Sequence, residues 1–167
     1  MKYSLFIKRE SFLTLSFIFL LSILFSSCSV KTYTPEIKSE FETDAVYTFG
    51  EFTYKCKIIK TADFVSVTPL ETRAAGMVIK CNGKSVTFTK GSFEKSFPVN
   101  DIDSTNPAYA LYCVFTSLDT ASAEYRDGRY YFRSKIPAGE YILTVSKASE
   151  FISLSLPQAG ISIEFLY

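Results

Sequence analysis

The chain contains no histidine and no tryptophan among its 167 residues. Histidine is the commonest general base and the usual nitrogen ligand of zinc, so its absence excludes most hydrolytic and zinc-dependent sites. Serine is plentiful, but no Gly-x-Ser-x-Gly elbow occurs, and Ser92 and Ser96 lie in a strand-like run. We therefore expect a protein that is not an enzyme and that has no catalytic residue and no cofactor.

An excess of charge of one sign is also missing. The 18 basic and 17 acidic residues give a formal net charge of +1. Residues 1–27 hold three of the basic and one of the acidic residues, so the rest of the chain has 15 basic against 16 acidic residues. Proteins that bind nucleic acid present a basic surface to the phosphates, and this composition excludes that class of partner.

Close pairs of carboxylates are few, and no metal-binding motif surrounds them. Asp101 and Asp103 are separated by one residue, a spacing that occurs in calcium loops, but the EF-hand pattern is absent. A solvated loop is the simpler interpretation, and we expect no metal site.

Cysteine is scarce, with four in the chain. Cys56, Cys81 and Cys113 follow Cys28, and an odd number of cysteines in an exported chain argues against a full disulfide framework. No Cys-x-x-Cys spacing occurs, and the last three cysteines fall in apolar patterns. The sequence predicts three reduced thiols that pack as small hydrophobic side chains.

The first residues have the parts of an export signal. Basic residues precede a nearly uncharged apolar run at 11–25, and the small residues Ser26 and Ser27 follow it. The run Phe25-Ser26-Ser27-Cys28 resembles the bacterial lipobox, in which cleavage leaves the cysteine as the mature N-terminus with lipid on its thiol. The alternative is an uncleaved anchor helix, since 11–27 is close to the length of about 17 to 25 residues that spans a bilayer.

These features predict three parts of the chain: a lipoprotein signal peptide at 1–27, a lipidated cysteine and tether at 28–40, and one β domain at 41–167. The 140 residues left of the 167 after cleavage are enough for one core. We expect an exported monomer, anchored by its lipid (palmitate or a similar acyl chain) to the outer face of the cytoplasmic membrane.

From residue 41 onward the chain is typical of a mainly β protein. Apolar and polar residues alternate in 52–58, 86–89 and 151–156, and compact turn signals separate such runs. Asn82-Gly83 and Asp127-Gly128 predict two-residue type I′ turns. Eleven antiparallel strands are expected, at 41–49, 51–60, 62–68, 76–81, 84–89, 91–97, 121–126, 129–135, 139–146, 149–156 and 160–166.

Two stretches favour helix. Pro107 follows Asn106, and apolar residues at helical spacing continue to Leu118, which predicts an amphipathic helix lying on the sheet. A short helical turn at 69–73 is also expected, with Thr68 before Pro69 as its N-cap.

The order of these elements resembles the LolA-type fold of lipoprotein carriers, outer-membrane lipoprotein receptors and LppX-type lipid-binding lipoproteins. The lipid-anchored members in Gram-positive anaerobes are the nearest in pattern. The resemblance covers about 41–166 and rests on Phe41-Glu42-Thr43-Asp44, on Val65 to Thr72 followed by Gly76, on Lys90-Gly91-Ser92-Phe93, on the helix, on the Asp127-Gly128 hairpin and on three closing strands. It implies an eleven-stranded, incompletely closed (half) β-barrel whose concave face is covered by one or two short helices, with an apolar cavity beneath. The functional arginine of the carriers has no counterpart that a local motif identifies.

Aromatic residues are abundant, with 16 Phe and 11 Tyr. They recur at every second position of several strands, and an apolar face of this kind must be covered by a helix, a second sheet or a ligand. If a cavity exists, we expect these residues to line it: Tyr54, Phe88, Tyr112, Phe115, Phe132 and Leu143.

Two functions remain open. The first is a membrane-anchored lipoprotein of the cell envelope that binds a lipid, an acyl chain or a lipidated partner in a hydrophobic cavity. The second is a non-catalytic structural or protein-interaction lipoprotein, in which the same rings make a filled core.

The anchor can be tested at Cys28. Cys28→Ser should abolish lipid attachment and leave uncleaved precursor, because the thiol that carries the lipid is gone. Metabolic labelling with a fatty-acid probe measures this directly, and labelling that persists in the variant would show that the chain is not lipidated at this position.

Overall fold

The computed structural model describes residues 35–167, so the predicted signal peptide, Cys28 and the first part of the tether lie outside the described residues. The described chain is mainly β, as predicted, with one α-helix, α2 (Pro107–Thr116), and three short 3-10 helices, η1 (Val99–Asp101), η2 (Leu118–Thr120) and η3 (Pro157–Ala159). The strands are β1 (Phe41–Phe49), β2 (Phe52–Lys60), β3 (Val65–Pro69), β4 (Val78–Cys81), β5 (Ser85–Lys90), β6 (Phe93–Pro98), β7 (Ser122–Arg126), β8 (Arg129–Ile136), β9 (Gly139–Ser146), β10 (Phe151–Leu156) and β11 (Ile161–Leu166). All eleven predicted strands are present. Within residues 35–167 no helix is long and apolar enough to cross a bilayer.

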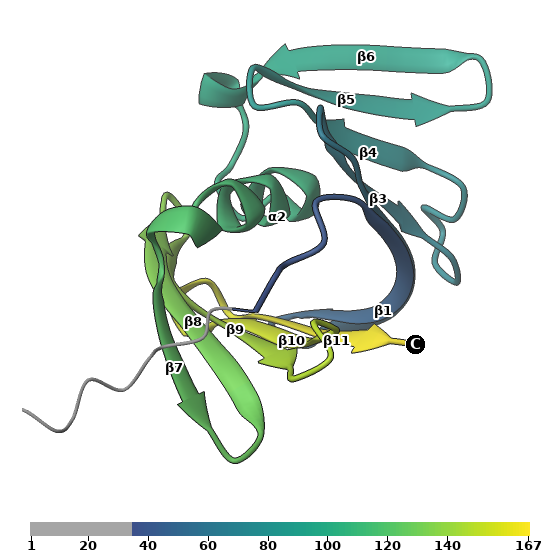
Figure 1. Ribbon diagram of the computed structural model, residues 1–167. Helices are drawn as coiled ribbons and strands as arrows, with labels where there is room; N and C mark the ends of the chain where they lie inside the picture. Colours follow the sequence, from purple (N-terminus) through teal and green to yellow (C-terminus); the bar gives the residue numbers. More distant parts are fainter. Residues whose placement is uncertain (1–34) are drawn as a thin grey trace, which may run out of the picture. The chain divides into compact units, whose positions relative to one another are not determined.

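All the strands belong to one antiparallel sheet that is not closed into a barrel (Figure 1). Its order is β6-β5-β4-β3-β2-β1-β11-β10-β9-β8-β7, so the first and last strands pair in the middle and the edges are β6 and β7. The chain passes from one edge to the other through α2. Figure 1 shows α2 inside the curl of the sheet, as expected for a half-barrel with a helix over its concave face.

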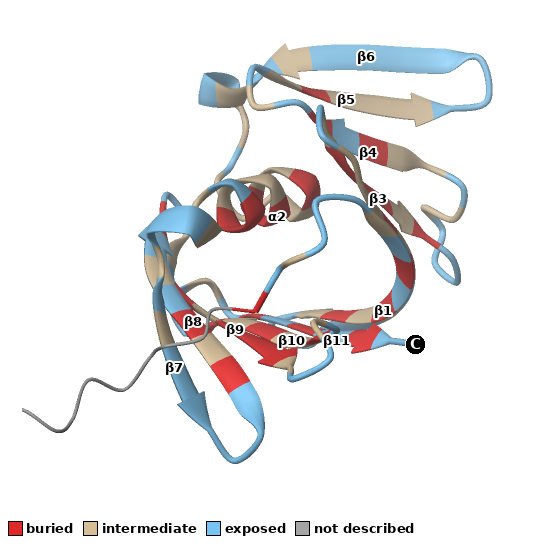
Figure 2. Ribbon diagram, in the orientation of Figure 1, coloured by how far each residue is buried: buried red, intermediate tan, exposed pale blue. Residues whose placement is uncertain are grey.

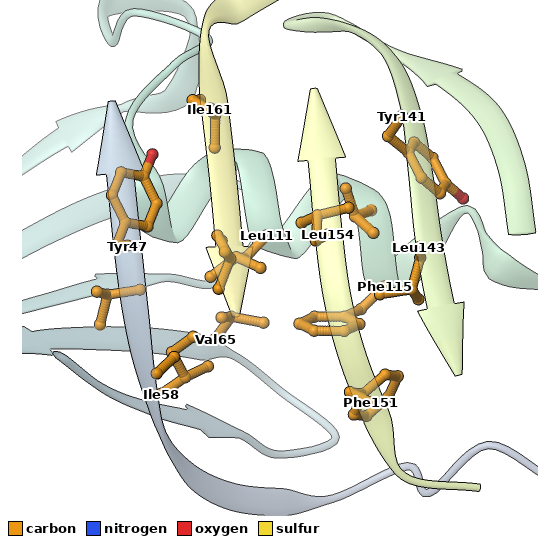
Figure 3. Packing of buried hydrophobic residues seen from close by; sticks show 14 of the residues in the cluster. Tyr47, Ile58, Val65, Leu111, Phe115, Tyr141, Leu143, Phe151, Leu154 and Ile161 are labelled. Atoms are coloured by element: carbon orange, nitrogen blue, oxygen red, sulfur yellow. The ribbon is translucent and has the colours of Figure 1, made fainter. Parts of the chain in front are cut away.

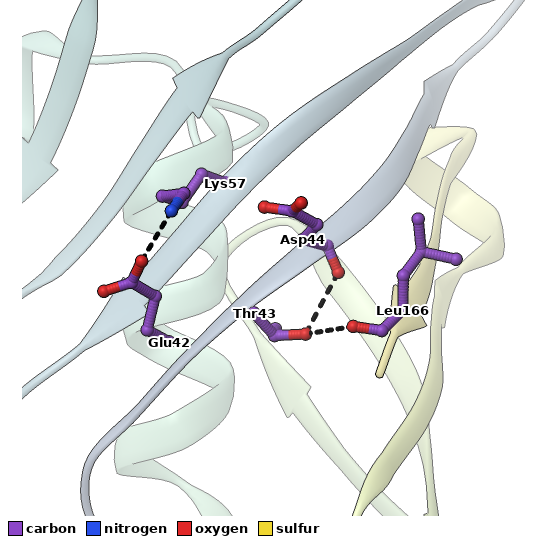
Figure 4. A network of polar contacts seen from close by, with 5 residues as sticks. All are labelled: Glu42, Thr43, Asp44, Lys57 and Leu166. Carbon is purple, nitrogen blue, oxygen red and sulfur yellow. Dashed lines mark hydrogen bonds and ion pairs between the residues drawn. The ribbon is translucent and has the colours of Figure 1, made fainter.

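The pairing of β1 with β11 joins the two ends of the described chain. Their register runs from Asp44 opposite Leu166 to Phe49 opposite Ile161. At one end of this junction the Thr43 hydroxyl donates a hydrogen bond of 2.6 Å to the Leu166 carbonyl oxygen (Figure 4). The Lys57 ammonium donates to a Glu42 carboxylate oxygen at 2.6 Å, an exposed ion pair between β2 and β1.

The core lies on the concave side. Alternate residues of the central strands point into it and are buried, whereas β6 and β7 are exposed along most of their length (Figure 2). Burial of one such side chain contributes about 1.5 to 3 kcal/mol, so this face dominates the stability of the domain. The largest fully buried side chains are Tyr141, Phe132, Phe151, Ile58, Leu111, Leu143, Leu154, Leu156 and Ile163.

Helix α2 begins where its sequence indicates. The Asn106 side chain accepts a hydrogen bond from the Tyr109 backbone N–H, and Pro107 occupies the first turn, where it has no backbone N–H to satisfy. The helix ends at Thr116, two residues before the predicted end. Its apolar side, including Leu111 and Phe115, packs on the sheet near Phe151, Leu143 and Leu154 (Figure 3).

Residues 35–40, the described part of the predicted tether, touch the domain. Pro35 is buried and Ile37 packs against the core cluster. The Lys60 ammonium donates to the Ser39 carbonyl oxygen at 2.8 Å, and the Ala62 backbone N–H donates to the Glu40 carboxylate at 3.2 Å.

The predicted helical turn at 69–73 is wrong. Pro69 is the last residue of β3 and pairs with Cys56 of β2, and turns follow at 73–76. The missing N–H of Pro69 is tolerated because β4 pairs with β3 only as far as Val67, so no hydrogen bond is lost on that side.

The two predicted type I′ turns differ. Asp127 and Gly128 both have positive φ, 53° and 77°, as a type I′ turn requires. At the other hairpin Gly83 has a φ of 83°, whereas Asn82 does not have a positive φ. The Asn82 side-chain oxygen instead accepts hydrogen bonds from the backbone N–H groups of Lys84 and Ser85, which closes the turn from the side chain.

Gly83 also lies directly against α2. A Cβ atom at this position would be 2.5 Å from the Tyr112 hydroxyl oxygen, whereas a Cβ at Gly128 would meet no atom within 4 Å. Gly83→Ala should therefore lower the free energy of unfolding by about 1 kcal/mol more than Gly128→Ala. Both substitutions place a side chain at a positive φ, but only the methyl group at position 83 also clashes with the Tyr112 ring. Urea unfolding of both variants measures the difference, and equal losses would show that the Tyr112 ring moves aside without cost.

Candidate ligand-binding groove

A groove opens at the end of the β1–β2 hairpin, facing the segment that leads into α2. Its volume is about 390 Å³, within the range of about 300 to 1,000 Å³ that is usual for small-molecule sites. Ten residues line it: Tyr47, Phe49, Phe52, Tyr54, Asp101, Ile102, Asp103, Thr105, Asn106 and Pro107. One wall is aromatic and the other is largely polar.

The aromatic wall follows from the register of one hairpin. The chain reverses at Gly50, whose φ is 57°, so that Tyr47 pairs with Tyr54 and Phe49 pairs with Phe52. The side chains of residues 47 and 49, and of 52 and 54, point to the same side because they are two apart on a strand. The Tyr47 and Tyr54 rings are stacked, with centroids 5.2 Å apart and planes at 28°. We call these four rings the aromatic ladder.

The outer end of the aromatic ladder is open to solvent. The exposed fraction of Phe52 is 75%, and that of Phe49 is 43%, whereas Tyr47 is only 2% exposed. Large apolar rings left exposed at a concave site are typical of a binding surface.

Tyr47 carries a buried hydroxyl group without a partner. Its Oη atom makes no hydrogen bond within the described part of the chain, and Figure 3 shows the hydroxyl directed toward the C-terminal end of β1. Burial raises the pKa of Tyr47 well above its ordinary value and raises the pKa of Tyr54 to about 12. Both hydroxyls are therefore neutral at physiological pH, and that of Tyr47 is able to donate or accept one more hydrogen bond.

The polar wall is held in shape by its own hydrogen bonds. Asp103 Oδ1 accepts from the Thr105 backbone N–H at 2.8 Å and from the Thr105 hydroxyl at 2.6 Å. These bonds lower the pKa of the Asp103 carboxyl, which stays charged at neutral pH. Because Asn106 also caps α2, the loop is fixed to a helix rather than free.

A second groove lies at β8, β9 and η3. Its volume is about 480 Å³, and its lining residues are Arg133, Ser134, Lys135, Glu140, Tyr141, Ile142 and Pro157. Arg133 forms an ion pair with Glu124 at 2.9 Å, and Glu140 adds an opposite charge to the lining. The charges are mixed, and aromatic rings do not form a wall there.

The six predicted cavity residues do not line one common cavity. Phe115, Phe132 and Leu143 are exposed by 7%, 1% and 0% and belong to the core cluster. Tyr54 lines the groove. Phe88 makes an edge contact with Phe97 at 5.9 Å, and Tyr112 lies over Gly83.

Phe115 cannot serve to test ligand binding. Its ring lies 5.3 Å from that of Phe41 and 5.4 Å from that of Phe151, so a glutamate here would bury a charge in the core. A test of binding needs a more exposed position.

Of the ten groove residues, only Tyr54 is among the predicted cavity residues. The signal existed in the symmetric placement of aromatic residues at 47, 49, 52 and 54 about a tight reversal at Gly50. For Asp101 and Asp103 the sequence indicates no more than a spacing that also occurs in calcium loops. Nothing in the sequence indicated that they face the hairpin, because that depends on the path between β6 and α2.

The unpartnered hydroxyl makes a prediction about stability. Tyr47→Phe should raise the free energy of unfolding by about 1 kcal/mol, because it removes a buried polar group that has no hydrogen bond. Tyr141→Phe is the matched control, since the Tyr141 hydroxyl is hydrogen-bonded to Ser117 at 2.9 Å and its loss should destabilise. Thermal unfolding compares them, and destabilisation of similar size in both variants would show that the Tyr47 hydroxyl has a partner.

No family model and no curated protein matches the chain. Among solved structures, the chain is similar to a LolA superfamily protein from Nitrosomonas europaea, with a TM-score of 0.38 and 9% sequence identity. The match covers 80% of this chain and 86% of that one.

Proposed function

We propose that this protein is a lipoprotein of the cell envelope, anchored through Cys28, that binds a lipid, an acyl chain or a lipidated partner. It acts stoichiometrically and not as an enzyme. The observation that carries the proposal is the groove at the β1–β2 hairpin, where exposed Phe49 and Phe52 rings line a space of about 390 Å³.

The chemistry of the groove suits an apolar chain. Transfer of an acyl chain from water onto apolar walls contributes about 0.8 kcal/mol for each buried methylene. Phe52 is 75% exposed in the free protein, so a bound chain would remove ring surface from water as well as its own. The buried end of the groove, at Tyr47, would receive a polar atom of the ligand.

A structural or interaction protein is the second candidate, and the packing under α2 favours it. Leu111 and Val114 are completely buried against the sheet, so the helix covers a filled core at its centre. The edge strands β6 and β7 each have one side whose backbone groups pair with no strand of the sheet, and a strand of a partner protein could form hydrogen bonds there.

Non-covalently bound lipid separates the two candidates. The full-length chain, purified from its native host in a neutral detergent, should retain lipid that mass spectrometry quantifies after extraction. Phe52→Glu should reduce the amount of bound lipid about tenfold. A bound acyl chain would have to remove water from the charge placed at the exposed end of the aromatic ladder, which costs free energy.

Phe93→Glu is the matched control. Phe93 is also a solvent-exposed phenylalanine, at 56%, but it lies on β6 outside the groove, so this variant should retain as much lipid as the natural protein. Equal loss in both variants would indicate detergent-like adsorption, and absence of lipid from the natural protein would favour the structural candidate.

A further inference from the structure

We infer that the groove recognises an organic ammonium group, free or as the headgroup of a lipid, between the aromatic ladder and the carboxylates of Asp101 and Asp103. This inference rests on the proposed binding function and specifies the charge of the ligand. Its elements are four rings on one wall, two carboxylates on the other and a buried hydroxyl without a partner.

Elsewhere in the domain, three rings have one of the chain's own cations over a face. Lys80 lies 3.8 Å from the centroid of Phe64, Lys95 lies 4.8 Å from that of Phe97, and the Arg126 guanidinium lies 5.2 Å from that of Tyr131. None of the ten residues lining the groove is a lysine or an arginine. Within residues 35–167 the rings of the aromatic ladder hold no such cation. The Tyr47 and Tyr54 rings are stacked on each other, whereas the exposed Phe49 and Phe52 rings attract positive charge in the same way.

The opposite wall adds negative charge. Asp101 and Asp103 both line the groove, and neither forms an ion pair with a residue of the described chain. The hydrogen bonds from Thr105 hold Asp103 in place and keep it ionised. An anionic headgroup would meet two like charges here, whereas a cationic one would meet two opposite charges.

The combination suits an organic cation rather than a metal ion. Calcium and magnesium need six or more oxygen ligands, and no cluster of three or more metal-binding side chains occurs in the described residues. An ammonium group with carbon substituents is weakly hydrated, and it contacts rings and carboxylates together. The neutral Tyr47 hydroxyl at the buried end is able to accept a hydrogen bond from an N–H or O–H of the ligand.

The test compares small ligands of one tail length. Hexyltrimethylammonium, 1-hexanol and hexanesulfonate dissolve as monomers, and tetramethylammonium presents the headgroup without a tail. Calorimetric titration into the full-length protein in a neutral maltoside detergent should show hexyltrimethylammonium binding about tenfold tighter than 1-hexanol, with hexanesulfonate the weakest.

Two variants locate the selectivity. The double variant Asp101→Asn and Asp103→Asn should weaken binding of hexyltrimethylammonium about tenfold and leave that of 1-hexanol unchanged, since asparagine keeps the shape and removes the charge. Asp119→Asn, at an exposed aspartate of η2 outside the groove, is the matched control and should change neither. Phe52→Leu should weaken binding of hexyltrimethylammonium more than binding of 1-hexanol, because leucine keeps an apolar side chain but has no ring face.

The outcomes separate this inference from the proposed function. Binding of tetramethylammonium alone would identify the ammonium group as the ligand, and binding only of the tailed cation would identify a lipid-like amphiphile. Equal affinity for the cation, the alcohol and the sulfonate would overturn the ammonium inference and leave apolar binding intact. Failure of all of these ligands to bind would overturn both.

Discussion

The fold depends on the antiparallel pairing of β1 with β11. This ladder, from Asp44–Leu166 to Phe49–Ile161, joins two meanders that would otherwise be separate sheets. It places the first strand in the centre, buried on its concave side through Ala45 and Tyr47. The β1 side of the β1–β2 hairpin is consequently paired up to its end, where Phe49 lies opposite Ile161 and the Gly50 backbone N–H donates to the Gly160 carbonyl oxygen at 2.9 Å. On the other side, β3 pairs with β2 only from Cys56 to Lys60, so the end of β2 that carries Phe52 is free of a neighbouring strand. A groove built on this hairpin is positioned by the most central part of the sheet.

The size of α2 explains why the groove exists. Ten residues of helix reach about 15 Å, whereas a nine-residue strand such as β1 spans about 30 Å. One such helix is too short to cover the whole apolar face of an eleven-stranded sheet. Leu111, Val114 and Phe115 fill the space directly beneath it, and the concave surface beyond its N-terminus is left to Tyr47, Phe49 and their neighbours. The cavity implied beneath the helix is therefore displaced to its N-terminal end.

Function and stability make opposite demands on this end of the domain. A Tyr47 hydroxyl without a partner and a Phe52 ring that is 75% exposed both cost free energy in the free protein. A bound amphiphile would offset both, with the carbon atoms of its ammonium headgroup and the first methylenes of its tail on the rings and a polar atom at the hydroxyl. The carboxylates of Asp101 and Asp103 lie on the wall that such a headgroup would approach. The groove thus has the features of a binding site rather than of an unfinished core.

The strands, the turn at Asp127-Gly128 and helix α2 were predictable from the sequence, because alternation, glycine at positive φ and the Asn106-Pro107 cap are local properties. The sequence also carried the aromatic residues of the hairpin in their symmetric positions about Gly50. It could not place Asp101 and Asp103 opposite those rings, nor bury Phe115, Phe132 and Leu143 together, since these contacts join residues far apart in the chain. Even the end of β3 at Pro69 depended on how far β4 extends. Local chemistry determined the elements, and only the curling of the sheet around one short helix decided which aromatic residues are core and which are exposed in the groove.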